Sequence, residues 1–140
     1  MGQSLQFEVQ GTPQPQGSAR AFIVGGKARI TSANAKMMPF RQQVTQMARY
    51  TIASQNAPEP MFSKQTPVRL VLDFTFRKPV SAPKRRTHCA VKPDVDKLCR
   101  MAADALTGSV WHDDAQVVEL IARKHYGQVE GMRVQVEGIE

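Results

Sequence analysis

The stretch Val68-Arg69-Leu70-Val71-Leu72-Asp73-Phe74-Thr75-Phe76 decides the fold class, because large apolar residues occupy every second position. Successive side chains of a strand point to opposite faces, so this alternation predicts a strand with one buried face. Residues 94–106 follow a helical period instead, with apolar residues on one side and Gly108 just past the end. Pro93 disfavours helical geometry in the residue before it, so the helix is expected to begin near Asp94.

Apolar spacing identifies the other elements in the same way. They are expected to be a strand at Leu5–Val9, a hairpin of 20–24 and 27–30 around Gly25-Gly26, a helix at 37–54 and a final strand at 132–136. The segment 115–126 is open between helix and strand, and its β-branched residues favour a strand. The resulting order, βββαβαββ, predicts a single α/β (α+β) domain over residues 1–140, with a mixed sheet and two main helices.

Composition argues against several classes of protein. The chain has 140 residues and 41% of them are hydrophobic, as in ordinary soluble domains. Its apolar runs are too short to cross a bilayer, and its first residues lack the basic start and apolar stretch of a secretory signal. We therefore expect a cytoplasmic protein without a membrane partner. Cys89 and Cys99 form no CxxC pair and are expected to be free thiols, and their spacing to His88 and His112 matches no zinc site.

The charge balance indicates a polyanionic partner. The chain has 19 Lys and Arg residues against 12 Asp and Glu, which gives a formal net charge of +7. Such a surplus favours contacts with phosphates. Basic residues gather between Arg77 and Arg100, and residues 77–93 have the composition of a long, functional loop. Candidate phosphate contacts are Arg20, Lys84, Arg85, Arg86, Lys92 and Lys124.

Two acidic pairs suggest the chemistry. Lys92-Pro93-Asp94-Val95-Asp96-Lys97 places two aspartates at the start of the expected helix, and Trp111-His112-Asp113-Asp114-Ala115-Gln116 places two more after a glycine turn. Hydrolysis of a phosphodiester is commonly assisted by Mg²⁺, which prefers carboxylate oxygens. If the turn brings both pairs together, they form a magnesium site. The alternative is that the first pair caps the helix and the second pair forms a polar turn.

Three motifs, taken together, resemble the signature of the RusA-type Holliday junction resolvases. They are Lys92-Pro93-Asp94-Val95-Asp96, Asp104-Ala105-Leu106-Thr107-Gly108 and Asp113-Asp114-Ala115-Gln116-Val117, and the loop of residues 11–20 resembles the opening loop of that family. The resemblance implies a homodimeric, magnesium-dependent enzyme, in which Mn²⁺ could substitute and no small-molecule cofactor is needed. Such an enzyme nicks four-way DNA junctions in pairs during recombination and repair, and a bacterial or phage origin is expected.

The resemblance also assigns roles to individual residues. Asp94, Asp96 and Asp114 match the catalytic acids, and Asp113 matches a neighbouring acid expected to share the metal. The chain departs from the family pattern at two positions, with Lys97 where asparagine is common and Arg100 where lysine is common. Arg100 ranks first and Lys97 second as the cation that stabilises charge on the phosphate, although arginine does not readily donate a proton. Asp104 matches the acid of the second motif.

Two other functions stay open from the sequence. One is a non-catalytic basic DNA-binding module whose aspartates are caps, and the other is a metal-dependent nuclease acting on flap or other branched DNA. Trp111 is open between stacking on a base and packing in the core. His112 and His125 are weaker candidates for contacts at the site or with DNA, and Asp73 is given no role.

Overall fold

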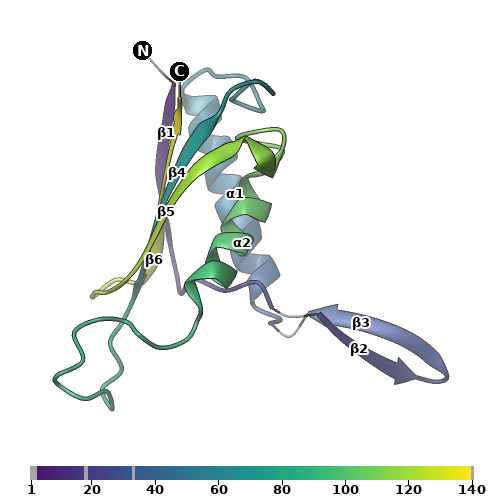
Figure 1. Cartoon of the computed structure of the whole chain (residues 1–140), viewed down its shortest axis with the longest axis vertical. Helices are drawn as coiled ribbons and strands as arrows, with labels where there is room; N and C mark the ends of the chain where they lie inside the picture. Colours follow the sequence, from purple (N-terminus) through teal and green to yellow (C-terminus); the bar gives the residue numbers. More distant parts are fainter. Residues whose placement is uncertain (1–2, 18, 33, 140) are drawn as a thin grey trace.

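A four-stranded mixed sheet carries two helices on one of its faces (Figure 1). The computed structural model describes residues 3–17, 19–32 and 34–139, without the side chains of 19–24 and 28–32. The strands of the sheet are β1 (Ser4–Gln10), β6 (Gly131–Gly138), β4 (Val68–Phe76) and β5 (Val117–Tyr126), in that spatial order. β6 pairs antiparallel with both β1 and β4, whereas β4 and β5 are parallel. The predicted α+β fold with a mixed sheet is confirmed.

The two helices bury the apolar face of the sheet. They are α1 (Met37–Ser54) and α2 (Val95–Leu106), and they pack on each other as well as on the strands. In β4 the residues at even positions are buried and those at odd positions are half-buried, as the alternation predicted. The other face of the sheet is left to polar side chains such as Arg69 and Asp73. The core is therefore one layer between sheet and helices.

A separate hairpin projects from this body (Figure 1). β2 (Ala19–Val24) and β3 (Lys27–Ser32) pair antiparallel and form their own two-stranded sheet. The turn residues Gly25 and Gly26 have φ values of 58° and 78°, a region that glycine enters without a steric penalty. The hairpin predicted around these glycines is confirmed. Within the described ranges, no helix is long and apolar enough to cross a membrane.

A β4–α2–β5 unit sets the position of the acidic motifs. The loop of residues 77–93 leads from the end of β4 to α2, and α2 then runs back along the sheet to the start of β5. A short 3₁₀ turn, η1 (Asp114–Gln116), precedes β5, so the ambiguous segment 115–126 is a strand after one turn. Because β4 and β5 are parallel, the connecting helix is antiparallel to both. The first acidic motif thus lies at one end of α2 and the second at the other.

Candidate active site

Asp94 occupies the N-cap position of α2 without acting as a cap. Its backbone is extended, with φ −70° and ψ 137°, and its side chain makes no capping hydrogen bond. The carboxylate is half-exposed, and its described ion pair is with Lys97, whose Nζ lies 3.9 Å from Asp94 Oδ2. An N-cap side chain normally accepts a hydrogen bond from the first turn. The cap interpretation therefore fails for this carboxylate, which is left available for another partner.

Asp96 and Arg100 lie one helical turn apart on the exposed side of α2. Asp96 is the acidic residue of the first turn, near the positive end of the helix dipole. Half-burial raises the pKa of the neighbouring Cys99 thiol, and the negative charge of Asp96 raises it further. The Arg100 side chain is exposed, and among the described contacts it has neither a hydrogen bond nor an ion pair. One acid and one cation are thus presented together to solvent.

A groove of about 430 Å³ runs beside Asp94. One wall is the opening loop at residues 12–15 with Asn34, and the other includes Lys92, Asp94 and Lys97. A backbone contact joins the two walls, since the Gln16 amide donates to the Lys97 carbonyl at 3.0 Å. Within the first wall, Asn34 Nδ2 donates to the Pro15 carbonyl at 3.1 Å. The loop that the sequence linked to the first motif therefore lies against it.

Asp113 and Gln116 shape the second acidic motif. Asp113 Oδ1 accepts from the Ala115 amide at 2.9 Å, and Gln116 Oε1 accepts from the Asp113 amide at 3.1 Å, which is a capping box for η1. The buried Gln116 side chain also donates to the carbonyls of Ser63 and Thr66 at 2.7 and 3.0 Å. Asp113 thus has the structural role that the turn interpretation gave it. Its predicted place as a metal ligand stays untested.

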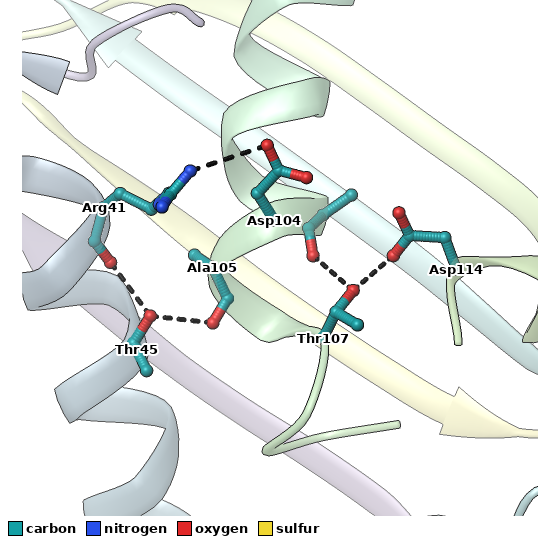
Figure 2. A network of polar contacts seen from close by, with 7 residues as sticks. Arg41, Thr45, Asp104, Ala105, Thr107 and Asp114 are labelled. Carbon is teal, nitrogen blue, oxygen red and sulfur yellow. Dashed lines mark hydrogen bonds and ion pairs between the residues drawn. The ribbon is translucent and has the colours of Figure 1, made fainter. Parts of the chain in front are cut away.

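Asp114 is fixed at the last turn of α2 (Figure 2). Its Oδ1 accepts from the Thr107 hydroxyl, and Thr107 is the C-cap residue of the helix. The indole Nε1–H of Trp111 points at the same place, 3.1 Å from Thr107 Oγ1 and 3.2 Å from Asp114 Oδ1. Trp111 is fully buried, so its role is packing and not stacking on a base. The buried Trp111 side chain therefore helps to hold Asp114, the third of the predicted catalytic acids.

Asp104 belongs to a different network on α2. It forms an ion pair with Arg41 of α1 at 3.6 Å (Figure 2). Close by, the Thr45 hydroxyl lies 2.8 Å from the Ala105 carbonyl and joins the two helices. These contacts place α1 on one side of α2. Asp104 therefore serves the contact between the two helices. Thr107 and Asp114, by contrast, lie at the end of α2.

The expectation that one chain gathers both acidic pairs at one point is wrong. Within the described part of the chain, no group of three or more His, Cys, Asp or Glu side chains is placed to hold a metal ion. The physical reason is the length of α2. Asp94 is the N-cap residue of this helix, whereas Asp114 is hydrogen-bonded to Thr107, its C-cap residue. From Asp96 to Thr107 the helix rises about 16 Å at about 1.5 Å per residue. Gly108 does turn the chain, with φ 95°, but toward Trp111.

The predicted phosphate contacts have different surroundings. Lys84, Arg85 and Lys92 are exposed and Arg86 is half-buried, all in the loop between β4 and α2. Lys124 was predicted to face DNA, but its Nζ donates to the Val91 and Pro93 carbonyls at 2.6 and 2.9 Å. The parallel register pairs it with Phe74, which turns it to the helix side, where it anchors the start of α2. Arg20 lies in β2, and its side chain is outside the described residues.

Comparison with known proteins decides the family. Residues 10–137 match the family described as endodeoxyribonuclease RusA. The chain belongs to the RusA family. This family match covers all three acidic motifs and the opening loop, and it makes the chain an endodeoxyribonuclease. The chain is also 29% identical over 143 residues to the uncharacterized protein YqaN of Bacillus subtilis (strain 168), covering 96% of both chains.

Two residues of the RusA motifs had no predicted role. Thr107, within the second motif, holds Asp114, and Gln116, within the third, ties η1 to residues 63–66. Their only sequence signal was their place inside the motifs. Asp73, also without a predicted role, accepts from His125 at 2.7 Å and Arg123 at 3.4 Å on the open face of the sheet. Burial raises the pKa of Asp73, but these two partners outweigh it and the net pKa is lowered.

Proposed function

We propose that this RusA-family endodeoxyribonuclease is a magnesium-dependent resolvase that acts as a homodimer and cuts four-way DNA junctions by paired nicks during recombination and repair. The observation that carries the proposal is the Asp94 carboxylate, which holds the N-cap position of α2 without capping it and faces a groove flanked by lysines. A carboxylate that does not cap its helix and lies beside Lys92 and Lys97 suits a phosphate-binding surface that also needs a cation.

The side chains at the start of α2 have the roles expected of such a site. Asp94 and Asp96 supply hard oxygen atoms, and Arg100, exposed one turn further on, supplies positive charge for the scissile phosphate. Lys97 is the second candidate for that charge, and its ion pair with Asp94 restrains it. The exposed Lys84, Arg85 and Lys92, with half-buried Arg86, supply positive charge for contacts with the DNA backbone.

The donor chemistry suits magnesium, but the geometry of a single chain does not complete the site. Asp94, Asp96 and Asp114 offer carboxylate oxygens, which Mg²⁺ or Mn²⁺ accepts as ligands. When bound, such an ion stabilises charge on the phosphate and makes a bound water more acidic. Asp114 lies at the opposite end of α2 from the other two, so the described chain does not bring all three to one ion.

Cleavage of synthetic branched DNA tests the proposal. The protein is incubated with equal amounts of a labelled four-way junction, a flap and a linear duplex of the same sequences, with Mg²⁺ or with a chelator. We expect paired nicks in the junction with Mg²⁺, little cutting of the duplex, and none with chelator. Preferred cutting of the flap would instead assign the protein to flap processing, and binding without any cutting would make it a non-catalytic module.

A further inference from the structure

The hairpin of β2 and β3 is anchored at the groove beside the start of α2. The chain enters the hairpin through the opening loop and leaves it through Asn34, and both segments line that groove. Asn34 Nδ2 donates to Gln14 Oε1 at 3.2 Å and to the Pro15 carbonyl at 3.1 Å, which joins the entering and leaving segments. The Gln16 amide donates to the Lys97 carbonyl at 3.0 Å. The base of the hairpin is therefore attached to the first turn of α2.

The hairpin extends away from the body at the end of the molecule where α2 begins (Figure 1). The loop of residues 77–93, with its exposed cations, leaves the sheet at this end as well. Among the described elements, β2 and β3 have their main contacts with each other. Each strand has 6 residues, so the hairpin reaches about 20 Å at about 3.3 Å per residue. Two projections thus share one end of the molecule with Asp94 and Asp96.

The charged residues of the hairpin are all positive. They are Arg20, Lys27 and Arg29, and Lys27 is exposed beside the glycine turn. No aspartate or glutamate occurs in the sequence between Glu8 and Glu59, so no acid lies near the hairpin along the chain. A projection of this composition attracts polyanions and has no neighbouring carboxylate in sequence to neutralise it.

The strand register places the three cations on one face of the hairpin. Phe22 is opposite Arg29, and Val24 is opposite Lys27. Arg20 lies two positions before Phe22 on the same strand. Directly opposite residues share a face, as do alternate residues of one strand, so all three cations fall on the same side. The other face is made of uncharged residues, namely Ala19, Ala21, Ile23, Ala28, Ile30 and Ser32.

We propose that this hairpin binds a duplex arm of the junction, with its cationic face against the phosphates. The inference rests on the proposed function, and it adds Lys27 and Arg29 to Arg20 as phosphate contacts. A two-stranded β-ribbon fits the major groove of B-DNA, which is about 12 Å wide. The reach of about 20 Å corresponds to about six base pairs at about 3.4 Å each. Because the base of the hairpin is bonded to α2, DNA held along the hairpin is brought toward Asp94 and Asp96.

Binding of the uncut junction tests the role of the three cations. Affinity is measured in chelator over a series of salt concentrations, for wild type and for the triple variant Arg20→Ala, Lys27→Ala, Arg29→Ala. We expect the slope of log affinity against log salt concentration to become shallower by about 2 to 3, and the affinity to fall about 10- to 100-fold at about 0.1 M salt. The charge-keeping variant Arg20→Lys, Lys27→Arg, Arg29→Lys should retain both wild-type values. Unchanged affinity and slope in the alanine variant would overturn the proposal.

A matched control removes the same amount of charge elsewhere. Arg49, Arg69 and Arg133 are replaced by alanine together, and each of them is paired with a glutamate outside the hairpin and the loop of residues 77–93. This variant should keep the wild-type slope. A loss as large as that of the hairpin variant would show that only net charge matters, and it would overturn the proposal.

Hydroxyl-radical footprinting of the bound junction locates the contact. Wild type should protect the backbone of one arm up to about six base pairs from the cut. The alanine variant of the hairpin should lose this outer protection and keep the protection at the cut. Identical footprints for the two proteins would overturn the proposal.

Sedimentation equilibrium without DNA distinguishes this role from contact with a second copy of the chain. The alanine variant should have the same mass as wild type, and a change of mass would overturn the proposal by assigning the hairpin to assembly. If wild type binds the junction through the hairpin but does not cut it in Mg²⁺, the proposed function fails and the role of the hairpin stands.

Discussion

The Asp114 carboxylate accepts a hydrogen bond from the Thr107 hydroxyl at the end of the same helix that Asp94 begins. Trp111, fully buried, donates its indole proton at this point, so the position of Asp114 is tied to the core. The length of α2 thus separates the two acidic pairs. Asp114 therefore has a fixed position, because Thr107 and Trp111 both donate hydrogen bonds to it.

Thr107→Val tests whether the hydroxyl positions Asp114. Valine keeps the shape but removes the donor to Asp114 and one acceptor of the Trp111 indole. We expect a loss of about 1 kcal/mol in the free energy of unfolding. Displacement of the carboxylate should lower junction cleavage by about 10- to 100-fold.

The control for this variant is Thr51→Val, which removes a hydroxyl bonded to the Met47 carbonyl within α1. It should lose comparable stability and keep its cleavage rate. Equal cleavage by Thr107→Val and wild type would show that the hydroxyl does not position Asp114. Urea denaturation and a single-turnover cleavage assay provide the two readouts.

Gln116→Met tests the structural role of the third motif. The buried amide satisfies the carbonyls of Ser63 and Thr66 and the amides of His112 and Asp113. Methionine has a similar length but leaves these groups without partners, so we expect a loss of about 3 kcal/mol in the free energy of unfolding. A change below about 1 kcal/mol in denaturant titrations would mean that the clamp contributes little to folding.

The loop between β4 and α2 should carry part of the affinity for DNA. Replacing Lys84, Arg85 and Arg86 by alanine removes up to three phosphate contacts. We expect the slope of log affinity against log salt concentration to become shallower by about 2 to 3. The control is Arg49→Ala, which removes a cation of α1 that is paired with Glu59. This variant should leave the slope unchanged. An unchanged slope in the triple variant would exclude this loop from the interface.

Acidic pH should lower the stability of the protein through Asp73, which lies on the sheet face that the helices do not cover. The pKa of this carboxyl is lowered below its ordinary value of 3.8, because hydrogen bonds from His125 and Arg123 outweigh the opposing effect of burial. A lowered folded-state pKa means stabilisation above the ordinary value, which is lost as pH falls through the folded-state pKa. Stability of wild type should therefore decline more steeply than that of Asp73→Asn below about pH 4. Parallel stability curves in acid would contradict this.

Local patterns predicted the fold well because they depend on neighbours in sequence. The alternation at 68–76 and the apolar stripe at 94–106 identified β4 and α2, and the eight main elements occur in the predicted order. The boundary at Asp94 was predicted within one residue, since Pro93 marks it locally. The ambiguous segment 115–126 needed its partner β4 to settle it as a strand.

The site was harder to predict because it depends on contacts between distant segments. Thr107 lies only seven residues before Asp114, but no local pattern shows that the chain after Gly108 keeps Asp114 at this end of α2, so convergence with Asp94 was a reasonable but wrong expectation. Lys124 looked like a surface cation, and only the parallel register reveals that it binds backbone carbonyls under α2. Motif spacing alone could not show whether the two acidic pairs meet in the folded chain.

The most direct test of the central claim compares Asp96→Asn with Asp104→Asn on a four-way junction in Mg²⁺. Both residues are exposed aspartates of α2, but Asp104 is paired with Arg41 of α1 and lies about two turns further along the helix. We predict that Asp96→Asn binds the junction normally and cuts it at least about a hundredfold more slowly, while Asp104→Asn cuts near the wild-type rate. Cleavage by Asp96→Asn at the wild-type rate would contradict the account.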